Sequence, residues 1–385
     1  MRGYKWIIGL LLMMLLSACS KDEKTETPKQ PSMISVYVYL PERPIATRTG
    51  EGEVNPIQNL IDESIIKNLQ IWVFNHDTKA LIAYHNPNET INLGIENEEN
   101  VVTYQLKVSP EFEAVPDGHK PLVDVYVLAN VTGYDSTTER DDLDAALLDG
   151  THFGLESLTT EVPEGGLPMA AVNRGATVDG MAPVYKITHL KLTRTVSKLR
   201  FIFSRDRSEI PVKMTSVQLD ANMIPTDEYL FLGTDNNPYH IGNSSGISYN
   251  DLAVELLAEN DPVKTDICQN GNPLTYAYNE GMDPQEYENK IMEGLSGETP
   301  ELSLVGPFYL RESDKQLSGT IKYMVGDTSK PDMRFTMSNG GQYEFSRNHT
   351  WTVYAYCGSS GLELIKVIVK DWDDSVPRDY GVFNW

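Results

Sequence analysis

The chain has 385 residues, of which 32 are Lys or Arg and 55 are Asp or Glu, so its formal net charge is −23 at pH 7. Nucleic-acid binding needs a basic surface, and this charge therefore excludes proteins that hold DNA or RNA. The length is typical of two domains, and the 20 tyrosines favour β-structure.

Residues 1–18 have the features of a bacterial lipoprotein signal peptide. Arg2 and Lys5 precede an apolar run, Trp6–Leu16, that is too short to span a bilayer. The run leads into Leu-Ser-Ala-Cys, whose last residue, Cys19, becomes the lipidated first residue of the mature protein. The alternative is a plain secretory peptide with a chance cysteine. We predict an exported lipoprotein of the outer membrane, with residues 19–31 as a solvated tether.

The segment Ile34–Leu40 is predicted to be the first strand. Apolar Ile34, Val36, Val38 and Leu40 alternate with Ser and Tyr, the pattern of a strand with one buried face. The stretch that follows contains Pro, Gly and the arginines of positions 43 and 48, and it reads as a protease-accessible break. A strand on a tether with a break behind it suggests a strand that is removed or exchanged. The alternative is the first strand of a stable sandwich that is never cut.

Residues 32–183 are predicted to form an N-terminal domain. Its further strands are expected at 68–75, 79–84, 101–108 and 121–131, the last of them covered on both faces. The one clear helix is expected at 135–149, and an irregular connector is expected from 165 to 183.

Residues 184–385 are predicted to form a C-terminal domain that opens with a strand at 184–203. It carries a long insertion, 223–300, with little periodicity and a helix starting at Asp283. Its further strands are expected at 212–219, 302–310, 319–325, 332–337, 349–357 and 362–369. The predicted fold is mainly β, with two antiparallel β-sandwich domains and a few peripheral helices.

The sequence shows no catalytic motif. The seven histidines are scattered and match no zinc or nucleophile pattern, and the acidic group Asp371, Asp373 and Asp374 lacks calcium-loop spacing. We therefore expect no catalysis, no metal and no cofactor. Cys268 and Cys357 are either a disulfide, which the exported location permits, or free thiols.

Several segments, in their order and spacing, resemble the fimbrillin family of Bacteroidales, the lipoprotein subunits of type V pili. The segments that carry the resemblance are the lipobox ending at Cys19, Ile34–Leu40 with Thr47-Arg48, Leu69–Phe74, Tyr126–Val131, Gly166–Met169, Leu192–Leu199 and Arg347–Trp351.

The resemblance implies transthyretin-like β-sandwiches and a structural, non-catalytic role in a cell-surface fimbria. It implies that an arginine-specific protease cuts at Arg48, or at Arg43, and that a strand from a neighbouring subunit then replaces Ile34–Leu40. The implied donor is the strand before the tail or Val376–Trp385 itself, with Tyr380, Val382, Phe383 and Trp385 as its apolar residues. The implied partners are other fimbrial subunits, the outer membrane, the protease, and a host protein or glycan. Shaft, tip and anchor roles all stay open.

A glycan-binding surface lipoprotein is the alternative function. Tyrosines of the insertion could stack on sugar rings, although loop tyrosines more often form ordinary amphipathic surface. The tyrosines concerned are Tyr239, Tyr249, Tyr276 and Tyr278.

Overall fold

The structure, a computed structural model, is mainly β, which confirms the predicted fold class. It describes residues 31–40, 63, 66–86, 101–148, 158–159, 162–163, 165–205, 212–226, 228–233, 248–249, 251–257, 266–267, 304–337, 345–358 and 361–371. The two helices within these ranges are short: α3 covers Pro110–Ala114 and α4 covers Arg140–Asp144.

Two sheets face each other in the N-terminal half. The first has the order β4 (Val101–Lys107), β1 (Met33–Tyr39), β10 (Val184–Lys191) and β9 (Val178–Met181). The second has the order β11 (Thr193–Arg194), β8 (Met169–Ala176), β5 (Val123–Ala129), β2 (Leu69–Asn75) and β3 (Leu81–His85). The apolar side chains between them form one cluster, which includes Ile34, Ile71, Val125 and Ile187.

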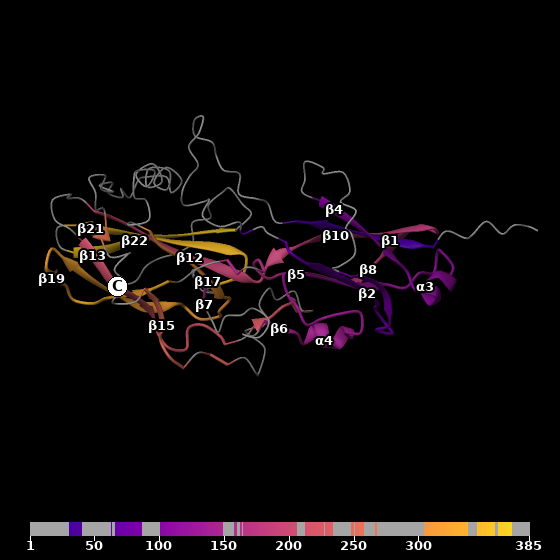
Figure 1. Ribbon diagram of the computed structural model, residues 1–385, viewed down its shortest axis with the longest axis horizontal. Coiled ribbons are helices and arrows are strands. Elements are labelled where there is room, and N and C mark those ends of the chain that lie inside the picture. The colour runs from indigo at the N-terminus through magenta and orange to yellow at the C-terminus, as the bar shows by residue number, and fades with distance from the viewer. Residues whose placement is uncertain are drawn as a thin grey trace, which may run out of the picture.

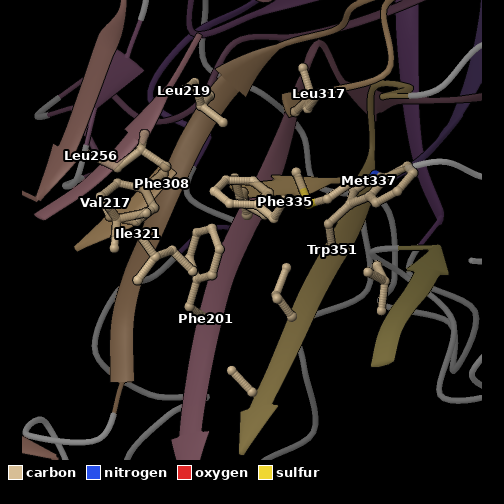
Figure 2. Close-up of a cluster of buried hydrophobic side chains, with 14 of the residues drawn as sticks. Phe201, Val217, Leu219, Leu256, Phe308, Leu317, Ile321, Phe335, Met337 and Trp351 are labelled. Atoms are coloured by element: carbon tan, nitrogen blue, oxygen red, sulfur yellow. The ribbon is translucent and has the colours of Figure 1, made fainter. Parts of the chain in front are cut away.

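Two further sheets face each other in the C-terminal half. One has the order β22 (Gly361–Asp371), β21 (His349–Gly358), β12 (Val196–Arg205), β17 (Leu304–Arg311) and β7 (Leu158–Thr159). The other contains β15 (Val254–Leu257), β13 (Val212–Leu219), β18 (Ser318–Val325) and β19 (Thr328–Ser329), with β16 (Asp266–Ile267) on β13 and β20 (Met333–Thr336) on β18. Their shared core is rich in aromatic residues (Figure 2), and the Phe201 and Phe335 rings meet edge to face at 5.8 Å.

The two halves repeat one strand order. In each half the first strand pairs in parallel with a late strand: β1 with β10, and β12 with β21. Each first strand also pairs antiparallel on its other side, β1 with β4 and β12 with β17. The facing sheets correspond in the same way, because β8, β5, β2 and β3 match β20, β18, β13 and β15. The two parallel pairs differ from the antiparallel sandwiches predicted above.

The chain passes between the two pairs of sheets at Thr195. The strand expected at 184–203 is three strands, and β10 pairs with β1 instead of starting the C-terminal sheets. The passage therefore lies twelve residues beyond the boundary predicted at 183. The irregular connector expected before residue 183 is wrong, because β8 pairs with β5 and β9 pairs with β10.

The helix expected at 135–149 is wrong over most of its length. Only α4 is helical, and Leu147–Leu148 form strand β6, which pairs with β14 (Glu228–Tyr229). Asp135 explains the late helix start, since its carboxylate accepts hydrogen bonds from the backbone and hydroxyl groups of Thr137.

A strap, residues 223–226 and 228–233, joins the two halves. Figure 1 shows the two pairs of sheets following one another along the molecule, with β6 and α4 beside their junction. On the strap, Leu230 and Phe231 are buried against β2 and β5 side chains such as Trp72 and Tyr126. Arg347 of the C-terminal half donates to the strap carbonyls of Tyr229 at 2.6 Å and Leu230 at 2.9 Å. The strap is thus held from both sides.

Glu228 on the strap makes the stability of the junction depend on pH. This fully buried carboxyl faces Glu312, Arg311 and Arg347, and burial raises its pKa from 4.5 to about 8. Because the folded state binds this proton more tightly, the stabilisation is complete below pH 4.5 and is lost as pH rises toward about 8. We expect Glu228→Gln, which mimics the protonated form, to raise the stability at pH 8 by at least about 1 kcal/mol, the equivalent of roughly one pKa unit.

Thermal melts at pH 4.5 and pH 8 measure this effect. Glu255→Gln, at an exposed position of β15, is the matched control and should follow the parent at both pH values. A Glu228→Gln protein that loses stability over this pH range as steeply as the parent contradicts the assignment.

Candidate functional site

Strand β1 lies inside its sheet. It pairs antiparallel with β4 from Met33, opposite Lys107, to Tyr39, opposite Val101, and it pairs in parallel with β10 on its other side. Removing β1 would therefore expose two facing rows of backbone groups, one on β4 and one on β10. A groove with two open strand edges can accept an added strand by β-augmentation.

The inner face of β1 fills three apolar positions. Ile34, Val36 and Val38 are each 0% exposed, and the predicted fourth member, Leu40, packs half-buried at the edge of the same core. Tyr104 of β4 lies opposite Val36, and burial raises its pKa to about 12. Tyr104 is therefore uncharged at neutral pH. Burying each of the three side chains is worth about 1.5–3 kcal/mol.

Both ends of β1 are fixed by hydrogen bonds. Before the strand, the Ser32 hydroxyl donates to Glu113 Oε1 at 3.1 Å, and the Met33 N–H donates to the Pro183 carbonyl at 2.8 Å. At the other end, the Leu192 N–H donates to the Tyr39 carbonyl at 2.9 Å. These contacts define the length of the groove as one strand, from helix α3 to the chain crossing at the junction.

An aromatic group covers part of the outer face of β1. The exposed His189 ring of β10 lies between Tyr37 and Tyr39, with ring centroids 4.9 Å apart in both pairs. A shift between Val36 and Val38 in the β1–β10 register accompanies this packing. The outer face therefore adds specific contacts to the backbone pairing that holds β1.

Sequence reasoning missed the features that hold the ends of β1. Helix α3 was not predicted, although Ser109 caps it and Pro110 stands at its first turn, which is a readable start signal. The parallel partner β10 was assigned to the other domain. No local signal could have found it, because strand pairing over such a distance depends on tertiary packing.

Many of the predicted site residues lie outside the described residues. They are Cys19, Arg43, Arg48, Cys268, Tyr380, Val382, Phe383 and Trp385. Cys357 lies in β21, and its pairing with Cys268 stays a prediction. Apart from Cys357, the residues of β1 predicted for strand exchange are thus the part of the predicted site that the structure describes.

The structure gives no support to the other chemistry considered. Among the described residues, no His, Cys, Asp and Glu side chains gather in a group that could hold a metal. In the same part of the chain, no helix is long and apolar enough to cross a membrane. Tyr249 donates its hydroxyl proton to Asp314, and the Lys315 ammonium lies 5.0 Å from its ring centre. Lys315 therefore lies over one face of that ring, and the other three tyrosines lie outside the described ranges.

Comparisons with known proteins agree with this architecture. A tip fimbrial protein of Porphyromonas gingivalis, Mfa3 with C-terminal truncation, has a TM-score of 0.50 at 12% identity, covering 89% of this chain and 100% of that one. A proposed cell adhesion protein of Bacteroides eggerthii also has a TM-score of 0.50, at 13% identity, covering 90% of this chain and 97% of that one. These two likenesses show the fold.

The family assignment comes from the sequence comparison. No curated protein matches the chain. A family model of the major fimbrial subunit protein, FimA, matches residues 34–227, which is half of the 385 residues and begins at the second residue of β1. The chain belongs to the FimA major fimbrial subunit family.

Proposed function

We propose that the chain is a structural subunit of a cell-surface fimbria and that it assembles by exchanging β1 for a strand of a neighbouring subunit. The position of β1 between β4 and β10, with three fully buried side chains on one face, is the observation that supports this most. In this proposal Cys19 carries the lipid anchor to the outer membrane. Cleavage at Arg48, or at Arg43, then cuts β1 from the rest of the chain.

The donor strand must present three apolar side chains at alternate positions. In residues 372–385 every such set of three includes a charged residue, an Asn, a Ser, a Pro or a Gly, each of which fits poorly in a dry apolar pocket. Strand β22 instead carries Ile365, Val367 and Val369, the same residue types in the same order as on β1. This match favours β22 of a neighbouring copy, with Tyr380, Val382, Phe383 and Trp385 as the alternative donor.

Such an exchange produces a chain of subunits. Because β22 lies in the C-terminal half and the groove lies in the N-terminal half, the contact joins different surfaces of two copies and does not close into a dimer. Strand β22 is an edge strand within the described residues, so it can leave β21 without breaking a second ladder. Its own Val367 and Val369 are buried, and insertion in the groove buries them again.

Limited trypsin treatment tests the proposal. We expect a core that begins at Thr49, loses β1 and forms a ladder of oligomers, because the open groove captures a donor strand. Size-exclusion chromatography and N-terminal sequencing measure these two results. Arg48→Ala should stay monomeric after the same treatment, and Arg43→Ala serves as the matched control. A core that starts at Thr49, has lost β1 and remains monomeric contradicts the exchange mechanism.

A further inference from the structure

A buried polar site surrounds Glu63, in the connection between β1 and β2. The Lys198 ammonium lies 3.0 and 2.8 Å from the two carboxylate oxygens of Glu63, and the Tyr309 hydroxyl donates to one of them at 2.8 Å. The Arg194 Nε donates to the backbone carbonyl of Glu63 at 3.1 Å. Tyr309 and Arg194 are 0% exposed and Glu63 is 8% exposed, so this is an enclosed site.

The partners of Glu63 come from strands on both sides of the chain crossing at Thr195. Arg194 lies in β11, Lys198 in β12 and Tyr309 in β17. Arg194 is held in turn, because its backbone N–H donates to the Asn348 side chain at 3.2 Å. Burial alone would raise the pKa of Glu63, but Lys198, Tyr309 and Arg194 together outweigh it and the pKa is lowered. The carboxylate is therefore ionised, and its loss would leave buried cations without their counter-charge.

We propose that Glu63 is a retention anchor that fixes the chain downstream of the cut to the C-terminal half, so that proteolysis frees β1 alone. This inference rests on the proposed strand exchange. Glu63 lies fifteen residues after Arg48, the expected cut, and six residues before β2. With Glu63 held, the downstream chain keeps a fixed end, and β2 and its core partners stay in place while β1 leaves.

A second trypsin site reports on the anchor. The side chain of Lys67 is exposed, but its backbone N–H donates to the Asn130 side chain at 2.8 Å, and the Asn68 carbonyl accepts from the Asn130 N–H at 3.2 Å. Cleavage between Lys67 and Asn68 thus requires local opening of the segment that Glu63 holds. When opening is fast relative to cleavage, the cleavage rate follows the population of the open form.

The experiment uses the full chain with trypsin and mass spectrometry of the new N-termini. We expect Glu63→Gln to speed the cut after Lys67 by roughly tenfold or more, as the loss of charge-assisted hydrogen bonds predicts. Glu111→Gln, at an exposed position of α3, is the control and should not change this rate. Tyr309→Phe removes one hydroxyl only and should speed the same cut by a smaller factor, which keeps the test valid if Glu63→Gln fails to fold.

The outcomes separate the anchor from the strand exchange. A Tyr309→Phe protein, or a folded Glu63→Gln protein, that is cut after Lys67 no faster than the parent overturns the anchor, whatever the oligomer ladder shows. A parent core that starts at Thr49 but makes no ladder overturns the exchange mechanism and leaves the Lys67 readout intact. Thermal melts of each variant before trypsin identify any general loss of fold.

Discussion

Val36→Asp should lower the free energy of unfolding of the N-terminal half by about 4 kcal/mol or more, since it places an unpaired charge in a closed apolar core. Val36 is 0% exposed and lies at the centre of β1, between Tyr104 of β4 and Ile187 of β10. A substitution on the exposed face leaves β1 in its groove, whereas Val36→Asp opposes the insertion of β1 itself. The variant should therefore have an open groove and form oligomers without protease treatment.

Denaturant titration and size-exclusion chromatography measure both effects. Tyr37→Asp is the matched control, because Tyr37 is the next residue, faces outward and is only partly buried. It should cost roughly 1 kcal/mol, the central value for point substitutions. A Val36→Asp protein that is as stable as Tyr37→Asp would show that β1 does not fill the groove as described.

Arg347→Met should cost about 3–5 kcal/mol, because it leaves a buried carboxylate without its partner. Arg347 Nη2 lies 2.5 Å from Glu312 Oε1, and the Glu312 side chain is 0% exposed. The same guanidinium also holds two strap carbonyls. Its loss should therefore weaken the core of the C-terminal half and the junction together.

Arg334→Met provides the contrast for this prediction. Arg334 is 66% exposed and its bidentate contact is to Asp220, so the loss should be at most about 1 kcal/mol, as for surface ion pairs. Denaturant titration of both variants gives the comparison. Similar losses for the two arginines would mean that the Arg347 pair is not shielded from water.

Strong local patterns predicted the strands. Strands β2 and β5 are mostly apolar, with Gln70 and Asp124 as buried polar members, and both are buried along nearly their whole length. For β5 this is what the sequence of residues 121–131 led us to expect. The alternation in residues 34–40 predicted the buried face of β1 correctly at Ile34, Val36 and Val38. Patterns of this kind follow from local geometry, which the sequence records directly.

Pairing between distant strands was beyond such patterns. Strand β8 includes Asn173, Arg174 and Gly175, which read as a loop, and it becomes a strand because β5 provides a partner. Leu147 and Leu148 fit a helix face equally well, and the strap turns them into a strand. The local sequence does not show which distant strand each of these segments pairs with, and that pairing decides their structure.

The sequence did not predict the buried ionic sites either, because they too depend on contacts between distant segments. Glu63 and Arg194 are buried and Lys198 is partly buried, yet all three are ordinary surface residue types, and nothing in their local sequence marks them as enclosed. Their enclosure depends on how the two halves meet. The arginine and cysteine residues, in contrast, were predicted from short sequence motifs, which can be recognised without knowing the fold.

The matching strand order of the two halves has a consequence for polymer shape. Strand β12 occupies in the C-terminal half the place that β1 occupies in the N-terminal half, yet β12 continues directly from β11 and leads on to β13. A single backbone break can therefore release β1 and open the groove between β4 and β10, whereas β12 is joined to the chain at both ends. In the proposed assembly the groove of each molecule accepts one donor strand from one neighbour. Growth is therefore unbranched, and the fibre has two different ends.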